Sequence, residues 1–161
     1  MKEIAFFILT AFVINNCTQS TSPPSDIILN GTFSLMDTTG QSSTQFSSGE
    51  EFRLIYSLTN NSKDTLTYYR GNSGPAIIFE IQKNDNVVAS SVDGYAFEAI
   101  AFKNHLAPGK SLSGNWLAPT TPAQYPKAVL GPGQYKATVS YPIFQEAKVD
   151  TVSPIYFTVI E

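Results

Sequence analysis

The sequence has very few of the residues that most often carry chemistry. It contains one cysteine, Cys17, and one histidine, His105, in 161 residues. A single cysteine excludes an intrachain disulfide, and no Cys/His cluster is available for a metal. A Ser-His-Asp or Cys-His unit would have to use His105, which follows Lys103 and Asn104 and is typical of a loop histidine. We therefore predict no catalytic residues, no metal and no cofactor.

Charged residues are also scarce, at 14% of the chain. The 10 Lys and Arg are scattered among 13 Asp and Glu, which argues against a nucleic-acid surface. Glu50 and Glu51 are typical of a solvated turn rather than a catalytic carboxylate pair. The triplet Asn84, Asp85 and Asn86 forms a turn far more often than a calcium site. No stretch after the N-terminal segment has the pattern of an amphipathic helix.

The N-terminal segment has the features of an export signal. Residues 4–14 are uncharged and apolar, but this run is too short to span a bilayer core of about 30 Å. It ends shortly before Cys17, and a polar tract rich in Ser, Thr and Pro follows. This order resembles a bacterial lipoprotein signal, with residues 1–16 as signal peptide, Cys17 as the lipid attachment site and residues 17–27 as a flexible tether.

The resemblance implies an exported lipoprotein of the cell envelope, held to the membrane by its lipid anchor only. The alternatives are an ordinary secretory signal, giving a periplasmic or secreted soluble protein, and an uncleaved N-terminal anchor. The predicted folded domain covers residues 28–161.

The clearest alternation of apolar and polar residues lies in residues 51–70. Phe52, Leu54, Tyr56 and Leu58 fall on one face of a strand, the period of two that a half-buried strand requires. After the polar residues 60–63 the alternation resumes, which predicts a hairpin. We predict these four apolar side chains as the centre of the core.

Further strands are predicted along the rest of the chain. Residues 37–48 are polar and loop-like, and residues 93–105 fit either a strand or an irregular crossover with one helical turn. Together the signals predict an all-β fold, an immunoglobulin-like antiparallel β-sandwich of about eight strands. The expected strands, besides the hairpin, cover residues 31–36, 76–82, 87–90, 111–116, 135–141 and 155–160, with a turn at residues 83–86.

Several of these segments also resemble one family. The strand from Phe52 runs into Asn60 and Ser62, and residues 74–88 form an apolar strand followed by an Asn/Asp turn. Two Pro-Gly turns precede strands, at residues 106–109 before Trp116 and at residues 132–135. The order and spacing of these segments resemble those of the intracellular proteinase inhibitor (BsuPI) family, a family of bacterial immunoglobulin-like domains. The resemblance implies a domain that acts through a protein partner, with a protease as the first candidate.

An inhibitor of this size needs a loop that is held extended, because ordering a flexible loop on binding costs affinity. Two segments are candidates: residues 119–126, which are rich in proline, and the loop of residues 70–75, with its arginine as a specificity residue. The glycines in the second loop favour a plain connection instead. The predicted partner-binding loop consists of Arg70, Gly71, Asn72, Ser73, Gly74 and Pro75.

Aromatic side chains offer a second type of binding surface. Tyr68, Tyr69, Tyr95, Trp116 and Tyr125 could form a platform for a sugar or a peptide, although core packing explains most of them equally well. From the sequence we predict a non-enzymatic, exported binding module and a candidate proteinase inhibitor. The alternative is a structural, adhesion or carbohydrate-binding lipoprotein of the cell envelope.

Overall fold

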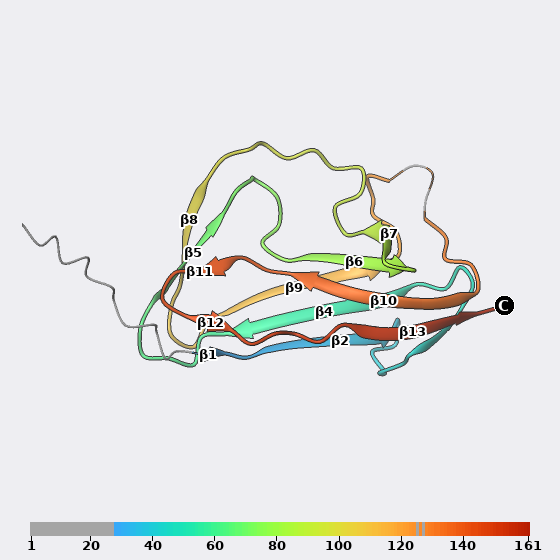
Figure 1. The fold of residues 1–161 in the computed structure, drawn as a ribbon, viewed down its shortest axis with the longest axis horizontal. Helices are drawn as coiled ribbons and strands as arrows, with labels where there is room; N and C mark the ends of the chain where they lie inside the picture. The colour runs from blue at the N-terminus through green and yellow to red at the C-terminus, as the bar shows by residue number, and fades with distance from the viewer. Residues whose placement is uncertain (1–27, 125, 127) are drawn as a thin grey trace, which may run out of the picture.

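A computed structural model describes residues 28–124, 126 and 128–161. These residues form an all-β structure of thirteen strands without a helix, which confirms the predicted fold class. The sites predicted within residues 1–27, including Cys17, lie outside the described residues. Figure 1 shows the long strands running side by side, with the C-terminus at one end.

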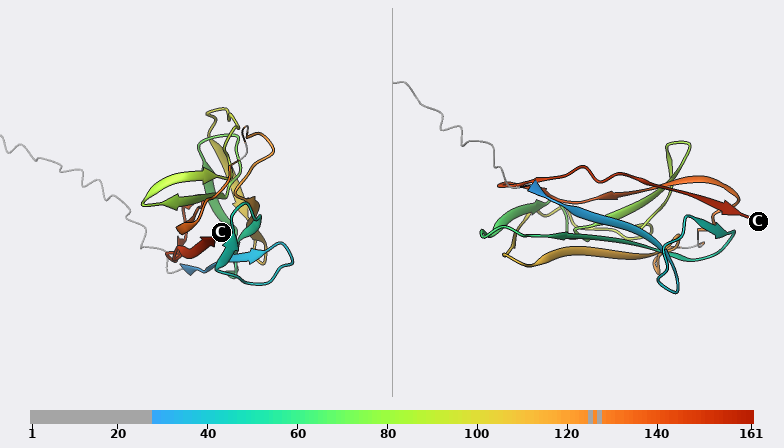
Figure 2. Two further views of the ribbon diagram at one scale, coloured as in Figure 1. Left: turned by 90° about the vertical axis from the view of Figure 1, so that its right-hand side faces the viewer. Right: turned by 90° about the horizontal axis from the view of Figure 1, so that it is seen from below.

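Two sheets form the body of the sandwich. The larger has the strand order β3-β13-β10-β6-β7, and the smaller has the order β2-β4-β9. Viewed from one end, they form two separate layers (Figure 2). The larger sheet contains β3 (Gln45–Ser47), β13 (Ile155–Ile160), β10 (Gly133–Ser140), β6 (Ile78–Lys83) and β7 (Asn86–Ser90), and the smaller β2 (Gly31–Asp37), β4 (Phe52–Thr59) and β9 (Ser111–Ala118).

Two small sheets lie at the end of the sandwich away from the C-terminus (Figure 1). One has the order β11-β5-β8 and is antiparallel, whereas the other pairs β1 with β12 in parallel. Their strands are β5 (Leu66–Arg70), β8 (Phe102–Leu106), β11 (Ile143–Phe144), β1 (Ile28–Leu29) and β12 (Lys148–Val149).

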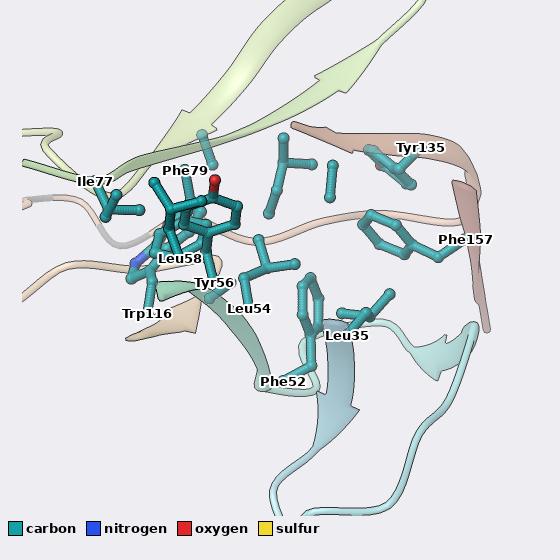
Figure 3. Close-up of a cluster of buried hydrophobic side chains, with 14 of the residues drawn as sticks. Leu35, Phe52, Leu54, Tyr56, Leu58, Ile77, Phe79, Trp116, Tyr135 and Phe157 are labelled. Carbon is teal, nitrogen blue, oxygen red and sulfur yellow. The ribbon is translucent and has the colours of Figure 1, made fainter. Parts of the chain in front are cut away.

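The core lies between the two main sheets and follows from the alternation in β4. Phe52, Leu54, Tyr56 and Leu58 are each at most 1% exposed, as predicted, whereas the residues between them are partly exposed. From the opposite sheet Phe79, Ile81, Tyr135, Ala137 and Phe157 are buried against them. Figure 3 shows Ile77 and Trp116 at one end of this cluster and Phe157 at the other.

The predicted hairpin of residues 51–70 is wrong. β4 pairs with β2 and β9, whereas β5 pairs with β8 and β11 in a different sheet. The reason lies in Asn60, which is fully buried rather than part of an exposed turn. Its side-chain amide donates hydrogen bonds to the carbonyls of Leu106 (2.8 Å) and Asp64 (2.7 Å), and so fixes the chain where it passes between sheets.

The hairpin predicted around residues 83–86 is present. β6 and β7 pair through a tight turn in which Asn84 and Asp85 have φ angles of 51° and 61°, the left-handed conformation that such turns require. Residues 93–101 form an irregular crossover without a helical turn, and β8 begins at Phe102.

The polar tract of residues 37–48 contains a strand that the sequence analysis assigned to a loop. β3 pairs in parallel with β13, and its one apolar residue, Phe46, is 2% exposed. Residues 142–153, between the expected strands 135–141 and 155–160, contain the two-residue strands β11 and β12. Such short strands have too few residues to show a period of two.

Candidate functional site

The predicted binding loop of residues 70–75 is folded onto itself. The Nη1 of Arg70 donates to the carbonyl of Gly74 at 2.5 Å, and its guanidinium carbon lies 5.2 Å from the centre of the Phe102 ring. The backbone N–H of Gly74 donates to the Oδ1 of Asn72 at 2.9 Å. Arg70 therefore holds its own loop together, and a specificity residue for a protease would have to release these contacts.

A second segment holds the same loop from outside. The Ser73 N–H donates to the carbonyl of Glu98 at 2.9 Å, and the Glu98 N–H donates to the Ser73 Oγ at 3.0 Å. Gly74 lies so close to Phe97 that a Cβ there would be 3.0 Å from the ring. Gly71 and Gly74 therefore do not make the loop flexible, and the loop is preorganised for binding.

A groove of about 660 Å³ lies between β9 and the chain that leads into β6. This volume falls in the range of about 300–1,000 Å³ that is usual for ligand sites. We call it the β9 groove. Its lining residues come from five segments of the chain: Glu51; Pro75, Ala76, Ile77 and Phe79; Ser91 and Tyr95; Ser113, Gly114, Asn115, Trp116 and Leu117; and Thr120, Thr121 and Pro122.

At the bottom of the β9 groove, β9 packs tightly against the start of β6 and the residue before it. A Cβ on Gly114 would be 2.7 Å from the Cβ of Ile77 and 3.1 Å from the ring of Phe79. Both side chains are buried, at 4% and 2% exposure. A glycine is therefore required at this position of β9, and it sets how closely β9 and β6 approach.

One wall of the groove is held by hydrogen bonds. The indole Nε1 of Trp116 donates to the carbonyl of Thr120 at 2.8 Å. Thr121, which is buried, donates from its hydroxyl to the carbonyl of Asp93 at 2.6 Å, and the Asp93 carboxylate accepts from the Ser90 N–H at 2.7 Å. Because these contacts join β9 to β7, the wall keeps its shape without a ligand.

The rim of the groove is an open sheet edge. β9 is the last strand of its sheet, and its register with β4 pairs Tyr56 with Gly114. At the end of this ladder the Asn60 N–H donates to the carbonyl of Lys110 at 2.9 Å, which fixes which residues face β4. By the alternation of an antiparallel ladder, Gly114 and its alternate neighbours exchange bonds with β4.

The other residues of β9 must then turn their backbone groups outward. These residues include Ser113, Asn115 and Leu117, and none of their N–H or carbonyl groups has a backbone partner outside the β4–β9 ladder within residues 28–124, 126 and 128–161. All three also line the groove. β9 has eight residues and carries neither charge nor proline, the features that commonly protect a sheet edge from a further strand.

The aromatic residues predicted as a platform do not lie together. Tyr95 and Trp116 line the β9 groove, whereas Tyr68 packs against Phe144 with ring centres 5.3 Å apart. Tyr69 is 47% exposed on β5, and Tyr125 lies outside the described residues. Two of the predicted aromatic residues thus line the groove, whereas its other lining residues come from separate segments that no local pattern in the sequence connects.

His105 lies on β8 opposite Thr67 and is exposed. In the described part of the chain no three His, Cys, Asp or Glu side chains are grouped closely enough to hold a metal. The same residues include no helix with the length and apolar character needed to cross a membrane. The absence of catalytic residues remains a prediction.

Comparisons with known proteins give little information about function. No family model matches the chain, and no curated protein matches it. Among solved structures, a β-glucosidase from Listeria innocua in complex with glucose matches with a TM-score of 0.39 and 13% sequence identity. The match covers 80% of this chain and 16% of the glucosidase, and at this similarity it says nothing about activity. The resemblance to the BsuPI family stays a prediction.

Proposed function

We propose that this domain is a non-enzymatic binding module that receives an extended segment of a protein partner along β9. The observation that carries the proposal is the row of outward backbone groups at Ser113, Asn115 and Leu117 beside an apolar groove. An extended segment that adds to an open edge gains main-chain hydrogen bonds, and its alternate side chains enter neighbouring pockets.

The β9 groove supplies both requirements. A segment bonded to the β9 edge would place every second side chain over the groove, where Ile77 and Trp116 offer apolar contact. The wall fixed by Trp116 and Thr121 lowers the ordering cost of binding. The partner segment should therefore be extended, with at least one apolar side chain at an alternate position.

The experiment uses peptides selected from a random library against the full chain. Asn115→Pro removes one outward N–H at an edge position that proline tolerates, whereas Asn115→Ala keeps that N–H. We expect the alanine variant to bind the selected peptides like the parent chain, and the proline variant to bind about two- to tenfold more weakly, which corresponds to the loss of roughly one hydrogen bond. Equal binding by both variants would refute strand addition at β9.

A proteinase inhibitor is the narrower form of this proposal, supported by the resemblance to the BsuPI family. The preorganised loop of residues 70–75 favours it, and the inward bonding of Arg70 counts against that residue as the specificity determinant. A panel of subtilisin-like and trypsin-like proteases, assayed with the full chain, tests it. Absence of inhibition at micromolar concentration across the panel would exclude this form while leaving peptide binding at β9 open to its own test.

We also propose that the module acts in the cell envelope, held by a lipid on Cys17. Metabolic labelling with a fatty-acid analogue should mark the parent chain and leave Cys17→Ala unlabelled. Label that persists in the variant would refute attachment at this cysteine.

A further inference from the structure

We propose that the outer face of the five-stranded sheet carries a second binding site, for a neutral carbohydrate, centred on Tyr156. This site shares no residue with the β9 groove and does not rest on the function proposed there. It is a shallow hollow of about 330 Å³ that includes Gln82, Asn84, Asp85, Gln134, Lys136 and Tyr156.

Tyr156 stands out from its neighbours on β13. It is 66% exposed, whereas Phe157, the next residue, is 2% exposed and faces the core. The register places Lys136 directly opposite both Tyr156 and Gln82, so these three side chains form a row across β13, β10 and β6. Side chains opposite one another in a sheet lie on the same face and within contact distance. An exposed aromatic ring thus lies flanked by polar side chains.

Two hydrogen bonds hold polar side chains that line the hollow, and each leaves one acceptor oxygen without a partner among the described residues. The Nε2 of Gln134 donates to the Thr158 hydroxyl at 2.9 Å, which positions the amide and leaves its Oε1 without a hydrogen-bond partner among the described residues. The Nζ of Lys136 donates to the Oδ1 of Asp85 at 2.7 Å, and in the same part of the chain the second carboxylate oxygen has no partner. Acceptors fixed in this way suit hydroxyl donors, because little side-chain entropy is lost on binding.

The charge of the hollow favours a neutral ligand. Lys136 and Asp85 neutralise each other, and the hydrogen bond from Lys136 lowers the pKa of the Asp85 carboxyl, so that the pair stays ionised. The other lining residues are uncharged. No unpaired cation of the hollow is therefore available to attract a phosphate or a carboxylate.

The backbone beneath the hollow excludes the recognition used at β9. The strands β6, β10 and β13 are all interior to the sheet, so none of them is an edge strand to which a further strand can add. A ligand on this outer face is therefore recognised by side chains. A pyranose fits both features of the site. The C–H groups on one side of the sugar ring would pack on the aromatic ring, and the sugar hydroxyls would donate hydrogen bonds to the fixed acceptors.

The test begins with the full chain on an array of neutral and acidic glycans, followed by NMR titration of the ¹⁵N-labelled chain with the best neutral trisaccharide. We expect millimolar binding and shifts of the amides of Gln82, Gln134, Lys136 and Tyr156. Tyr156→Ala should weaken binding about five- to tenfold, whereas Tyr156→Phe, which keeps the ring, should bind like the parent chain. Tyr69→Ala is the matched control at an exposed tyrosine on another sheet, and should have no effect.

Three outcomes would overturn the proposal: no neutral glycan bound in either assay, shifts located at the β9 groove instead, or unchanged affinity in Tyr156→Ala. Gln134→Ala provides a second variant, expected to bind more weakly because one fixed acceptor is lost. Dispersed amide spectra check that each variant is folded. Failure of peptide binding at β9 would leave all of these expectations unchanged.

Discussion

The two long sides of the sandwich are built differently. On the side of β2 and β13, Phe46 from β3 fills the space between the sheets, with ring centres 4.6 Å from Phe52 and 6.0 Å from Phe157. On the side of β9 and β6, crossing segments also pass between the sheets, but they leave the β9 groove above Gly114. We call these the Phe46 side and the groove side.

The difference shows how one core can serve two purposes. On the Phe46 side three phenylalanine rings are buried to at most 2% exposure, so nearly all of their apolar area contributes to folding. On the groove side Trp116 is also buried, but Tyr95 is 46% exposed and Leu117 is 37% exposed. The groove side thus leaves apolar area exposed, and the partner segment proposed above would cover this area.

The largest effect is expected from Phe46→Ala. Removing a buried phenylalanine leaves a cavity and should lower the free energy of unfolding by about 3–5 kcal/mol, measured by urea denaturation. Ile143→Ala is the control, because Ile143 is 82% exposed and its truncation should cost less than about 1 kcal/mol. Similar losses in the two variants would contradict the packing described for the Phe46 side.

On the groove side, Gly114→Val should combine a loss of stability with a loss of binding. The valine side chain would overlap Ile77. This overlap should lower the free energy of unfolding by about 1–3 kcal/mol and make the groove shallower. Gly71→Val is the control, since a Cβ at Gly71 would have no atom within 4 Å. If Gly114→Val kept full stability and full peptide binding, the close approach of β9 and β6 would be wrong.

A comparable effect is expected where the chain leaves the sandwich. Asn60→Ala leaves the carbonyls of Leu106 and Asp64 without their donor, and should lower the free energy of unfolding by about 1–3 kcal/mol in the same measurement. Asn61, the next residue, is exposed, so Asn61→Ala should change stability by less than about 0.5 kcal/mol. Equal effects would mean that the amide of Asn60 does not join the sheets.

The smallest effect concerns Tyr56, in the centre of the core. Its hydroxyl is buried without a hydrogen-bond partner in the described structure, so Tyr56→Phe should be neutral or stabilising by up to about 1 kcal/mol. Burial, with a smaller contribution from Tyr141, raises the pKa of Tyr56 from 10.0 to about 12.

This shift in pKa predicts a dependence on pH with a definite sign. Between pH 10 and 12 the unfolded chain loses the proton of Tyr56 while the folded chain keeps it, so the stability of the parent chain falls as pH rises. The Tyr56→Phe variant should lack the decrease in stability that Tyr56 causes between pH 10 and 12. The Tyr156→Phe variant, changed at an exposed site, should show the same decrease as the parent chain. Parallel pH profiles for the parent chain and Tyr56→Phe would contradict the burial of the hydroxyl.

The core could be predicted from the sequence because it depends on local alternation. Phe52 to Leu58 show a period of two over four apolar residues, and Ile77, Phe79 and Ile81 show it again before the turn at Asn84. The partner of each strand could not be predicted in the same way. Asn60 looks like a turn residue by type, and its hydrogen bond to the carbonyl of Leu106, 46 residues further on, is not visible in the sequence.

The two candidate sites were less accessible to prediction. The β9 groove combines residues from five separate segments, so no local pattern marks it. Tyr156 lies in a strand that the sequence predicts, but alternation alone does not distinguish an aromatic residue on an outer face from one that packs. Both sites depend on register between strands, which the sequence leaves open.

The pairing of Phe46 with Val159 has a consequence for how the protein is made. β13 lies between β3 and β10. β3, near the start of the described chain, therefore cannot join the sheet until β13, near its end, has paired. Contacts between such distant parts of a chain form slowly. Until residues 155–160 join the sheet, Phe46 lacks Phe157, and the uncharged edge of β9 is exposed on an incomplete domain. Such an edge can pair with other copies of the chain, so completion of the large sheet also limits aggregation.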